Sequence, residues 1–213
     1  DSATLPTNTA AAATALARRT RLTALIVACA LFMQNLDSTV IATALPTMAH
    51  VFGVPPVRMN VALTSYLLSL AVFIPASGWI ADRYGTRTVF RAAIAVFTIG
   101  SVLCGRADSL GFLVAARVLH GVSAALIQPQ LLDTFLATLD GEARSRAIGR
   151  YAATGGIAVV IGVLLGGLLL DANIAGTSWR PIFLVNVPVG LVALALAPRV
   201  VPASRSPQPA GVD

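Results

Sequence analysis

The sequence predicts an all-α membrane protein with six transmembrane helices. Hydrophobic residues make up 56% of the 213 residues and charged residues only 11%, and the mean hydropathy is +0.81. An ordinary soluble domain carries roughly 25% charged residues. The apolar residues gather in stretches long enough to cross a hydrocarbon core about 30 Å thick. The composition therefore excludes a soluble globular domain.

Six apolar stretches of about 20 residues follow one another along the chain. They cover residues 22–47, 59–81, 87–105, 110–136, 147–170 and 179–198. The connectors between them are rich in proline, glycine, aspartate and arginine, and none is long enough to hold a soluble domain. Residues 1–21 begin with low-complexity alanine and threonine, and residues 199–213 are rich in proline and serine. We expect both ends to be disordered cytoplasmic tails around a six-helix domain at 22–198.

The arginines predict the orientation of these spans. All 15 basic residues are arginine, and the formal net charge is +6. With a cytoplasmic N-terminus, Arg58, Arg106 and Arg180 fall outside, Arg117 lies within a span, and all the others face the cytoplasm. Arginine is concentrated in this way in the cytoplasmic loops of membrane proteins. The sequence thus predicts a multi-pass protein of the cell membrane with both termini cytoplasmic, and it gives no support for nucleic-acid binding.

A carboxylate interrupts the first apolar stretch, in "LFMQNLDSTVIATALP" (residues 31–46). Counting from the inner end places Asp37 roughly 22 Å into the membrane, and counting from the outer end of the fourth span places Arg117 roughly 20 Å from the inner face. Opposite charges at similar depth are expected to pair, because either alone is costly in the membrane. The pair either couples proton binding to movement or is a permanent bridge that fixes helix register, and we favour coupling.

Other polar residues in the spans are candidates for a site. His120 lies one turn beyond Arg117 and has a reference pKa of about 6.5, so it could handle protons, although a lone helical histidine is more often a packing residue. The candidates for lining a central cavity are Gln34, Asn35, Tyr66, Gln128 and Asn186. The sequence holds no constellation typical of an enzyme, a metal site or a cofactor site.

Several stretches resemble motifs of the major facilitator superfamily. "GWIADRYGTRTVF" (78–90) is similar to the signature loop between the second and third spans, a gating loop. The matching positions are Gly78, Asp82, Arg83, Gly85 and Arg87. "LDSTVIATALP" (36–46) resembles the first-span motif of the fourteen-span drug:proton antiporter branch, and it departs from that motif at Ala42, where asparagine is usual.

Three later stretches continue the resemblance in order. "ARVLHGVSAA" resembles the motif built on an intramembrane arginine, with His120 where glutamine is usual. "AVVIGVLLGG" (158–167) resembles the antiporter motif of the fifth span, with Val163 where proline is usual. "WRPIFLVNVPVG" (179–190) resembles the start of the sixth span in drug exporters.

Small residues recur along the fifth span. Ala158, Gly162 and Gly166 are four residues apart, a spacing that lets helix backbones approach closely. The resemblance places this helix at the junction between two halves of a transporter. Together with Gly167, these residues are expected to form a packing face at that junction.

The resemblance implies a transporter with alternating access, built from two six-helix halves that are each a 3+3 inverted repeat. This chain would supply the N-terminal half of a proton-coupled exporter of a small, drug-like compound. An uptake carrier or symporter on the same scaffold and a truncated, non-transporting membrane partner stay open as alternatives. The expected partners are the substrate, protons, the lipid bilayer, and either a missing C-terminal half or a second copy of the chain.

Overall fold

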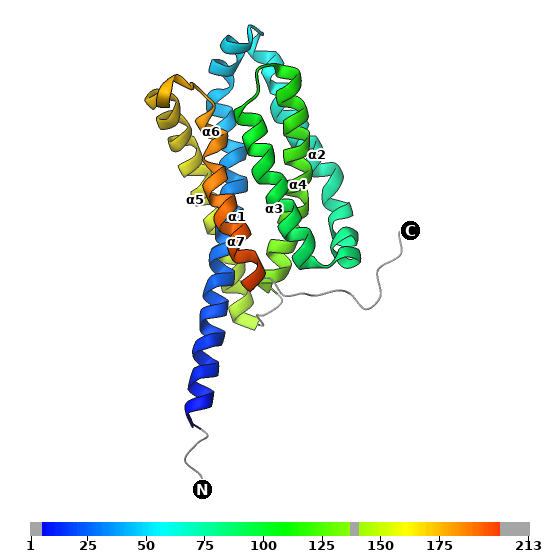
Figure 1. Ribbon diagram of the computed structural model, residues 1–213, viewed down its shortest axis with the longest axis vertical. Coiled ribbons are helices and arrows are strands. Elements are labelled where there is room, and N and C mark those ends of the chain that lie inside the picture. Colours follow the sequence, from blue (N-terminus) through cyan, green and yellow to red (C-terminus); the bar gives the residue numbers. More distant parts are fainter. Residues whose placement is uncertain (1–5, 137–140, 201–213) are drawn as a thin grey trace.

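The computed structural model describes residues 6–136 and 141–200, and these are almost entirely helical, with no strand (Figure 1). The helices are α1 (Pro6–Phe52), α2 (Pro56–Tyr84), α3 (Thr86–Gly105), α4 (Leu110–Leu136), α5 (Gly141–Ala172), the short 3₁₀ helix η1 (Ile174–Gly176), α6 (Pro181–Leu184) and α7 (Asn186–Val200). Within α1 to α5, five segments are long and apolar enough to cross a membrane. Helices α6 and α7 together occupy the position of the sixth predicted span. The prediction of an all-α, six-helix membrane protein is confirmed.

The structure describes part of each predicted tail as helix. Helix α1 begins at Pro6 and so includes residues 6–21. The physical reason is the run of alanines in this segment, because alanine has the highest intrinsic helix propensity. Helix α7 continues to Val200, two residues into the other predicted tail. Residues 1–5 and 201–213 lie outside the described part of the chain.

The sixth span is broken at Val185, between α6 and α7. The backbone N–H of Val185 still donates to the carbonyl of Pro181, at 3.0 Å. Pro188 has no N–H, so the helical bond that would reach back to the Leu184 carbonyl cannot form. Asn186 therefore stands at the start of α7, next to the break.

The pairing of the helices follows the pattern of two three-helix repeats. Helix α1 packs most extensively against α5, and α4 packs most extensively against α2. Helix α3 contacts α4, and α7 contacts α1. Suppose that α1 is exchanged with α4, α2 with α5, and α3 with α6 and α7. The contact of α1 with α5 then corresponds to that of α4 with α2, and the contact of α3 with α4 corresponds to that of α7 with α1. This is the arrangement expected of a 3+3 repeat. The start of α1 and the end of α7 lie at the same end of the bundle (Figure 1).

The buried core has two apolar parts, stacked along the bundle. One part contains Ile26, Met33, Phe90, Ile94, Phe97, Ile127 and Ala197. The other contains Val40, Met48, Met59, Cys104, Leu113, Trp179 and Phe183. On α1, α3 and α4, buried polar residues stand in the sequence between the members of the two parts. A polar layer therefore separates the two halves of the core.

Candidate functional site

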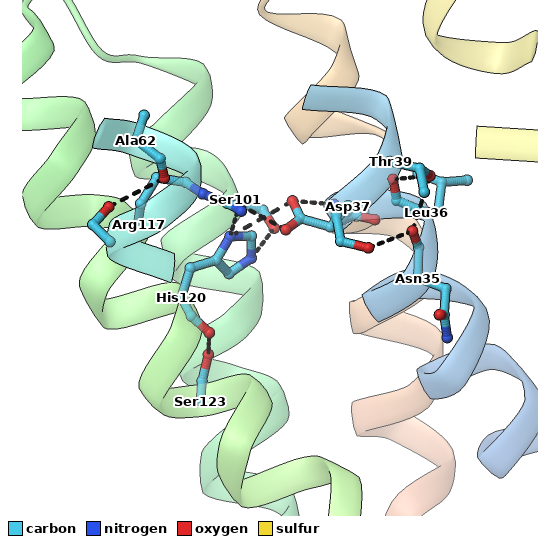
Figure 2. A network of polar contacts seen from close by, with 12 residues as sticks. Asn35, Leu36, Asp37, Thr39, Ala62, Ser101, Arg117, His120 and Ser123 are labelled. Atoms are coloured by element: carbon cyan, nitrogen blue, oxygen red, sulfur yellow. Dashed lines mark hydrogen bonds and ion pairs between the residues drawn. The ribbon is translucent and has the colours of Figure 1, made fainter. Parts of the chain in front are cut away.

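Asp37 of α1 and Arg117 of α4 form the centre of the polar layer. The Nη1 atom of Arg117 donates to Oδ2 of Asp37 at 2.6 Å, and neither side chain is exposed at all. Figure 2 shows the two side chains extending toward each other from facing helices. The structure thus brings together two charges that are 80 positions apart in the sequence. In a low-dielectric interior each compensates most of the cost of burying the other.

Two further side chains complete the surroundings of the carboxylate. The Nδ2 atom of Asn186 donates to Oδ1 of Asp37 at 3.4 Å. The Nδ1 atom of His120 lies 3.6 Å from the same oxygen and 3.1 Å from Nη1 of Arg117. The break before α7 places Asn186 here, although the sequence predicted it to line a cavity. Helices α1, α4 and α7 therefore meet at one carboxylate.

The contacts of His120 indicate which of its ring nitrogens carries a proton. An arginine N–H can only donate, so Nδ1 must accept from Arg117 and is unprotonated. The proton of the neutral ring is then on Nε2, which lies 3.1 Å from Oγ of Ser101 and donates to it. Gly100 makes room for the ring, because a Cβ at that position would stand 3.2 Å from Cδ2 of His120. The ring also packs against Phe97, with centroids 3.9 Å apart.

The guanidinium of Arg117 has binding capacity beyond its ion pair. Its Cζ lies 4.2 Å from the centre of the Tyr66 ring and 5.8 Å from that of Phe183. Its Nε and Nη2 atoms make no hydrogen bond within the described part of the chain. Aromatic faces attract a cation and are a partial substitute for the missing acceptors. Arg117 can therefore change its partners without leaving the layer.

An open pocket of about 170 Å³ adjoins the polar layer. It is lined by Leu31, Gln34, Asn35, Ser38, Tyr66, Leu67, Leu70 and Gln128. Four of the predicted cavity residues thus surround one space, and Asn186 is the predicted member that lies elsewhere. The Nε2 atom of Gln34 donates to the carbonyl of Ala124 at 2.9 Å, which holds its side chain across the gap between α1 and α4. Tyr66 belongs both to the pocket wall and to the surroundings of Arg117.

The predicted gating loop is the tight turn between α2 and α3. Gly85 has φ of 86°, and its N–H donates to the carbonyl of Ala81 at 2.8 Å. A side chain would be strained at this φ, which explains the glycine. The guanidinium of Arg83 lies 5.7 Å from the ring of Trp79 and 6.0 Å from that of Tyr84.

The other loop residues lie around this turn. Gly78 is exposed on α2, and Arg87 is half-buried in the first turn of α3. Asp82 is half-buried and takes part in no ion pair among the residues whose side chains the structure describes. The structure places the five residues at one end of the bundle, around the turn that joins α2 to α3.

Most of the predicted packing face of α5 lies against α1. Ala158, Gly162 and Gly166 are buried. A Cβ at Gly162 would clash with Oγ1 of Thr39, and a Cβ at Gly166 would clash with Oγ1 of Thr43, both on α1. The face therefore joins α5 to α1 within this bundle and is not available to a second half. A Cβ at Gly167 would meet nothing within 4 Å, so this residue is not part of the close approach.

Ser101 is a member of the polar layer that the sequence did not single out. It is fully buried and receives the hydrogen bond from His120. Serine and threonine in membrane helices commonly bond to their own backbone, as Thr98 does to the carbonyl of Ile94 at 2.8 Å. A single serine in an apolar stretch therefore carries no signal of a partner on another helix.

Comparison with known proteins places these features among membrane transporters. The sequence profile of the Major Facilitator Superfamily matches residues 27–212. The "Putative multidrug resistance protein MdtD" of Enterobacter sp. (strain 638) is 42% identical over 167 residues, which cover 78% of this chain and 35% of that protein. The protein of the same name from Serratia proteamaculans (strain 568) is 43% identical over 166 residues, covering 78% of this chain and 34% of its own length. The chain thus spans about a third of the length of these relatives.

Solved structures show the same fold at low sequence identity. The proton:xylose symporter XylE bound to 6-bromo-6-deoxy-D-glucose aligns with a TM-score of 0.70 at 16% identity, over 86% of this chain and 45% of that one. The inward open conformation of the xylose transporter XylE from E. coli aligns with a TM-score of 0.67 at 18% identity, over 84% and 48%.

Proposed function

The chain belongs to the Major Facilitator Superfamily, and on this premise we propose that it supplies the N-terminal half of a proton-coupled exporter of small, drug-like compounds. Efflux is supported by the relatives, whose name describes multidrug resistance. The XylE structures share too little sequence to indicate a substrate or a direction, and they support the fold alone. The observation that carries the coupling is the fully buried contact between Asp37 and Arg117.

The ion pair offers a physical route to coupling. While Asp37 is ionised, its Oδ2 accepts from Arg117, and the two helices are held together at this point. A proton added to the carboxylate removes the negative charge, so the attraction that holds Nη1 against Oδ2 is lost. Arg117 keeps its contacts with His120 and the Tyr66 ring. Proton binding can drive movement only because the two orientations of the transporter bind the proton with different free energies.

His120 is proposed as a second proton-handling residue. Its Nδ1 is an unprotonated acceptor that lies 3.6 Å from Oδ1 of Asp37. A proton on this nitrogen would face the carboxylate, and it would also face the donor Nη1 of Arg117, which would have to move away. Movement of a proton between Asp37 and His120 and rearrangement of Arg117 are therefore linked by geometry.

The substrate is proposed to enter the pocket beside the polar layer. Gln34, Asn35 and Gln128 offer hydrogen-bonding groups, and Leu67 and Leu70 offer apolar surface, which together suit an amphipathic compound. Because Tyr66 contacts both the pocket and Arg117, a compound in the pocket can influence the ion pair. A second six-helix unit, either the remainder of a longer chain or a second copy, is proposed to close the cavity.

Transport of a fluorescent cationic dye tests this function and its direction. Inside-out membrane vesicles that contain the complete assembly are expected to accumulate the dye when their lumen is acidic, and a protonophore should abolish the accumulation. Loss of preloaded dye from the lumen under the same gradient would favour an uptake carrier. Vesicles that do not respond to the gradient at all would favour a non-transporting membrane partner.

A further inference from the structure

A second pocket lies at the start of α3, at the opposite end of that helix from Arg106. Its volume is about 350 Å³, and it is lined by Arg87, Thr88, Arg91, Ala92, Ala95 and Leu194. The first five residues belong to α3, and Leu194 belongs to α7. Two guanidinium groups one turn apart thus stand beside a floor of small and apolar side chains. None of its lining residues belongs to the polar layer or to the pocket beside that layer, and Arg87 is shared with the predicted gating loop.

The position of Arg91 determines which kind of ligand this pocket favours. Arg91 is exposed, one helical turn further into the membrane than Arg87, a distance of roughly 6 Å. Among the residues whose side chains the structure describes, none of the ion pairs involves Arg91. A charged side chain that faces lipid is costly unless it reaches the headgroups or finds a counter-charge. Arg91 therefore favours an anionic ligand at the level where lipid headgroups begin.

Neighbouring aromatic residues mark that level. Trp79 and Tyr84 lie on the last turns of α2, next to the start of α3, and they are 37% and 53% exposed. Exposed tryptophan and tyrosine gather where the bilayer meets water. The pocket therefore opens at the headgroup region and extends toward the hydrocarbon core along Ala92, Ala95 and Leu194.

The local electrostatics favour a negative charge as well. The pocket is at the N-terminal end of α3, where the helix dipole is positive, and the first turn of α3 contains no acidic residue. The nearest acidic residue in the sequence is Asp82, which is half-buried at the end of α2. Arg87 adds its charge to the same turn.

We propose that this pocket binds an anionic phospholipid. The guanidinium group of Arg91 donates to the headgroup phosphate, because guanidinium geometry matches phosphate oxygens in pairs, and Arg87 adds a positive charge beside it. The upper part of an acyl chain lies in the space that Ala92 and Ala95 leave between α3 and α7. A lipid is favoured over a soluble phosphate because half of the lining is apolar and faces the membrane. A zwitterionic lipid lacks the net negative charge that the two arginines would neutralise.

Native mass spectrometry of the purified protein tests this site. The protein is incubated with equal amounts of phosphatidylglycerol and phosphatidylcholine of identical chains, and we expect phosphatidylglycerol to be retained preferentially. One arginine near the membrane surface contributes about 1 kcal/mol, so Arg91→Gln should lower this retention about fivefold. The matched control is Arg106→Gln, which removes an exposed arginine at the other end of α3 and should leave retention unchanged.

Two further arms separate a lipid site from a site for any soluble phosphate. Leu194→Gln should weaken retention of phosphatidylglycerol while leaving both arginines in place. Glycerol 3-phosphate, a soluble phosphate, should not displace the lipid. Equal retention of both lipids, equal losses in Arg91→Gln and Arg106→Gln, or displacement by glycerol 3-phosphate would each overturn the proposal. Thermal unfolding in phosphatidylcholine alone checks that the variants are folded, so a loss of lipid binding cannot be a loss of structure.

Discussion

Asp37 and Arg117 stabilise each other in a place where neither would be tolerated alone. Both side chains are fully buried in a membrane protein, and their charged atoms are 2.6 Å apart. Removing one partner of such a pair leaves an uncompensated buried charge, whereas removing both leaves none. The two residues are therefore expected to behave as a unit, in stability as well as in transport.

A double-mutant cycle measures this interdependence. Asp37→Asn alone should lower the free energy of unfolding by about 3–5 kcal/mol, because the charge of Arg117 stays buried without a counter-charge. Adding Arg117→Gln to Asp37→Asn should restore part of the loss. The measurement is denaturant unfolding in detergent. If the double variant is as unstable as the sum of the two single variants, the contact is not an energetic pair.

At the residue scale, the sequence predicts the pairing of Asp37 with Arg117 but not the other side chains that surround the pair. The depth of Asp37 and Arg117 follows from counting along regular helices, and a charge at that depth requires a partner. The roles of Asn186 and Ser101 depend on helix rotation and on the break at Val185. Both are fixed by packing between segments far apart in the sequence, so no local pattern could indicate them.

At the scale of helices, α5 packs closely against α1 because two residues of α5 at the contact are glycines. Gly162 and Gly166 face Thr39 and Thr43, whose hydroxyls donate to carbonyls of their own helix at 2.7–3.1 Å. The hydroxyl oxygens of the two threonines, already bonded to their own helix, are the atoms that a side chain at either glycine would meet first. Close backbone approach of this kind drives association where the hydrophobic effect is weak.

Substitution of Gly162 tests this packing against a control on the same helix. Gly162→Leu should destabilise the protein by about 1–3 kcal/mol, because the new side chain must displace α1. Gly167→Leu should change stability by less than about 0.5 kcal/mol, since a Cβ there meets nothing within 4 Å. Thermal unfolding in detergent compares the two variants. Equal destabilisation by both would show that helix propensity and not close packing is responsible.

The small-residue stripe shows what periodicity can and cannot predict. Spacing of four residues correctly indicated a face for close helix contact. It could not indicate the partner helix, because α1 and a helix of a second half could both pack closely against the same small residues. The helical start at Pro6 follows from the helix propensity of alanine, which the low complexity of the segment hides.

At the scale of the whole molecule, the arginines divide between the two ends of the bundle. Arg83, Arg87 and Arg91 lie at or near the end where α2 passes into α3, and three more arginines lie near the start of α5 at the same end: Arg144, Arg146 and Arg150 (Figure 1). Arg58, Arg106 and Arg180 lie at the other end. The start of α1 and the end of α7 are at the arginine-rich end (Figure 1). We propose that this end faces the cytoplasm, as the positive-inside rule predicts.

Thiol labelling tests the proposed orientation. Cys29 and Cys104 are first replaced by alanine, and single cysteines are introduced as Arg106→Cys or Arg146→Cys, both at exposed positions. In intact cells, a membrane-impermeant maleimide should label the first variant and should label the second only after the membrane is opened. The reverse labelling pattern would show that the termini face outward.

Proton release upon substrate binding by the complete assembly tests the coupling most directly. Purified transporter in weakly buffered solution should release protons when the dye is added, because the bound compound and the proton compete through Tyr66, Arg117 and Asp37. Asp37→Asn should abolish the release, while Asp108→Asn, at an exposed position, should leave it unchanged. Undiminished proton release by Asp37→Asn would show that the buried ion pair does not couple protons to transport.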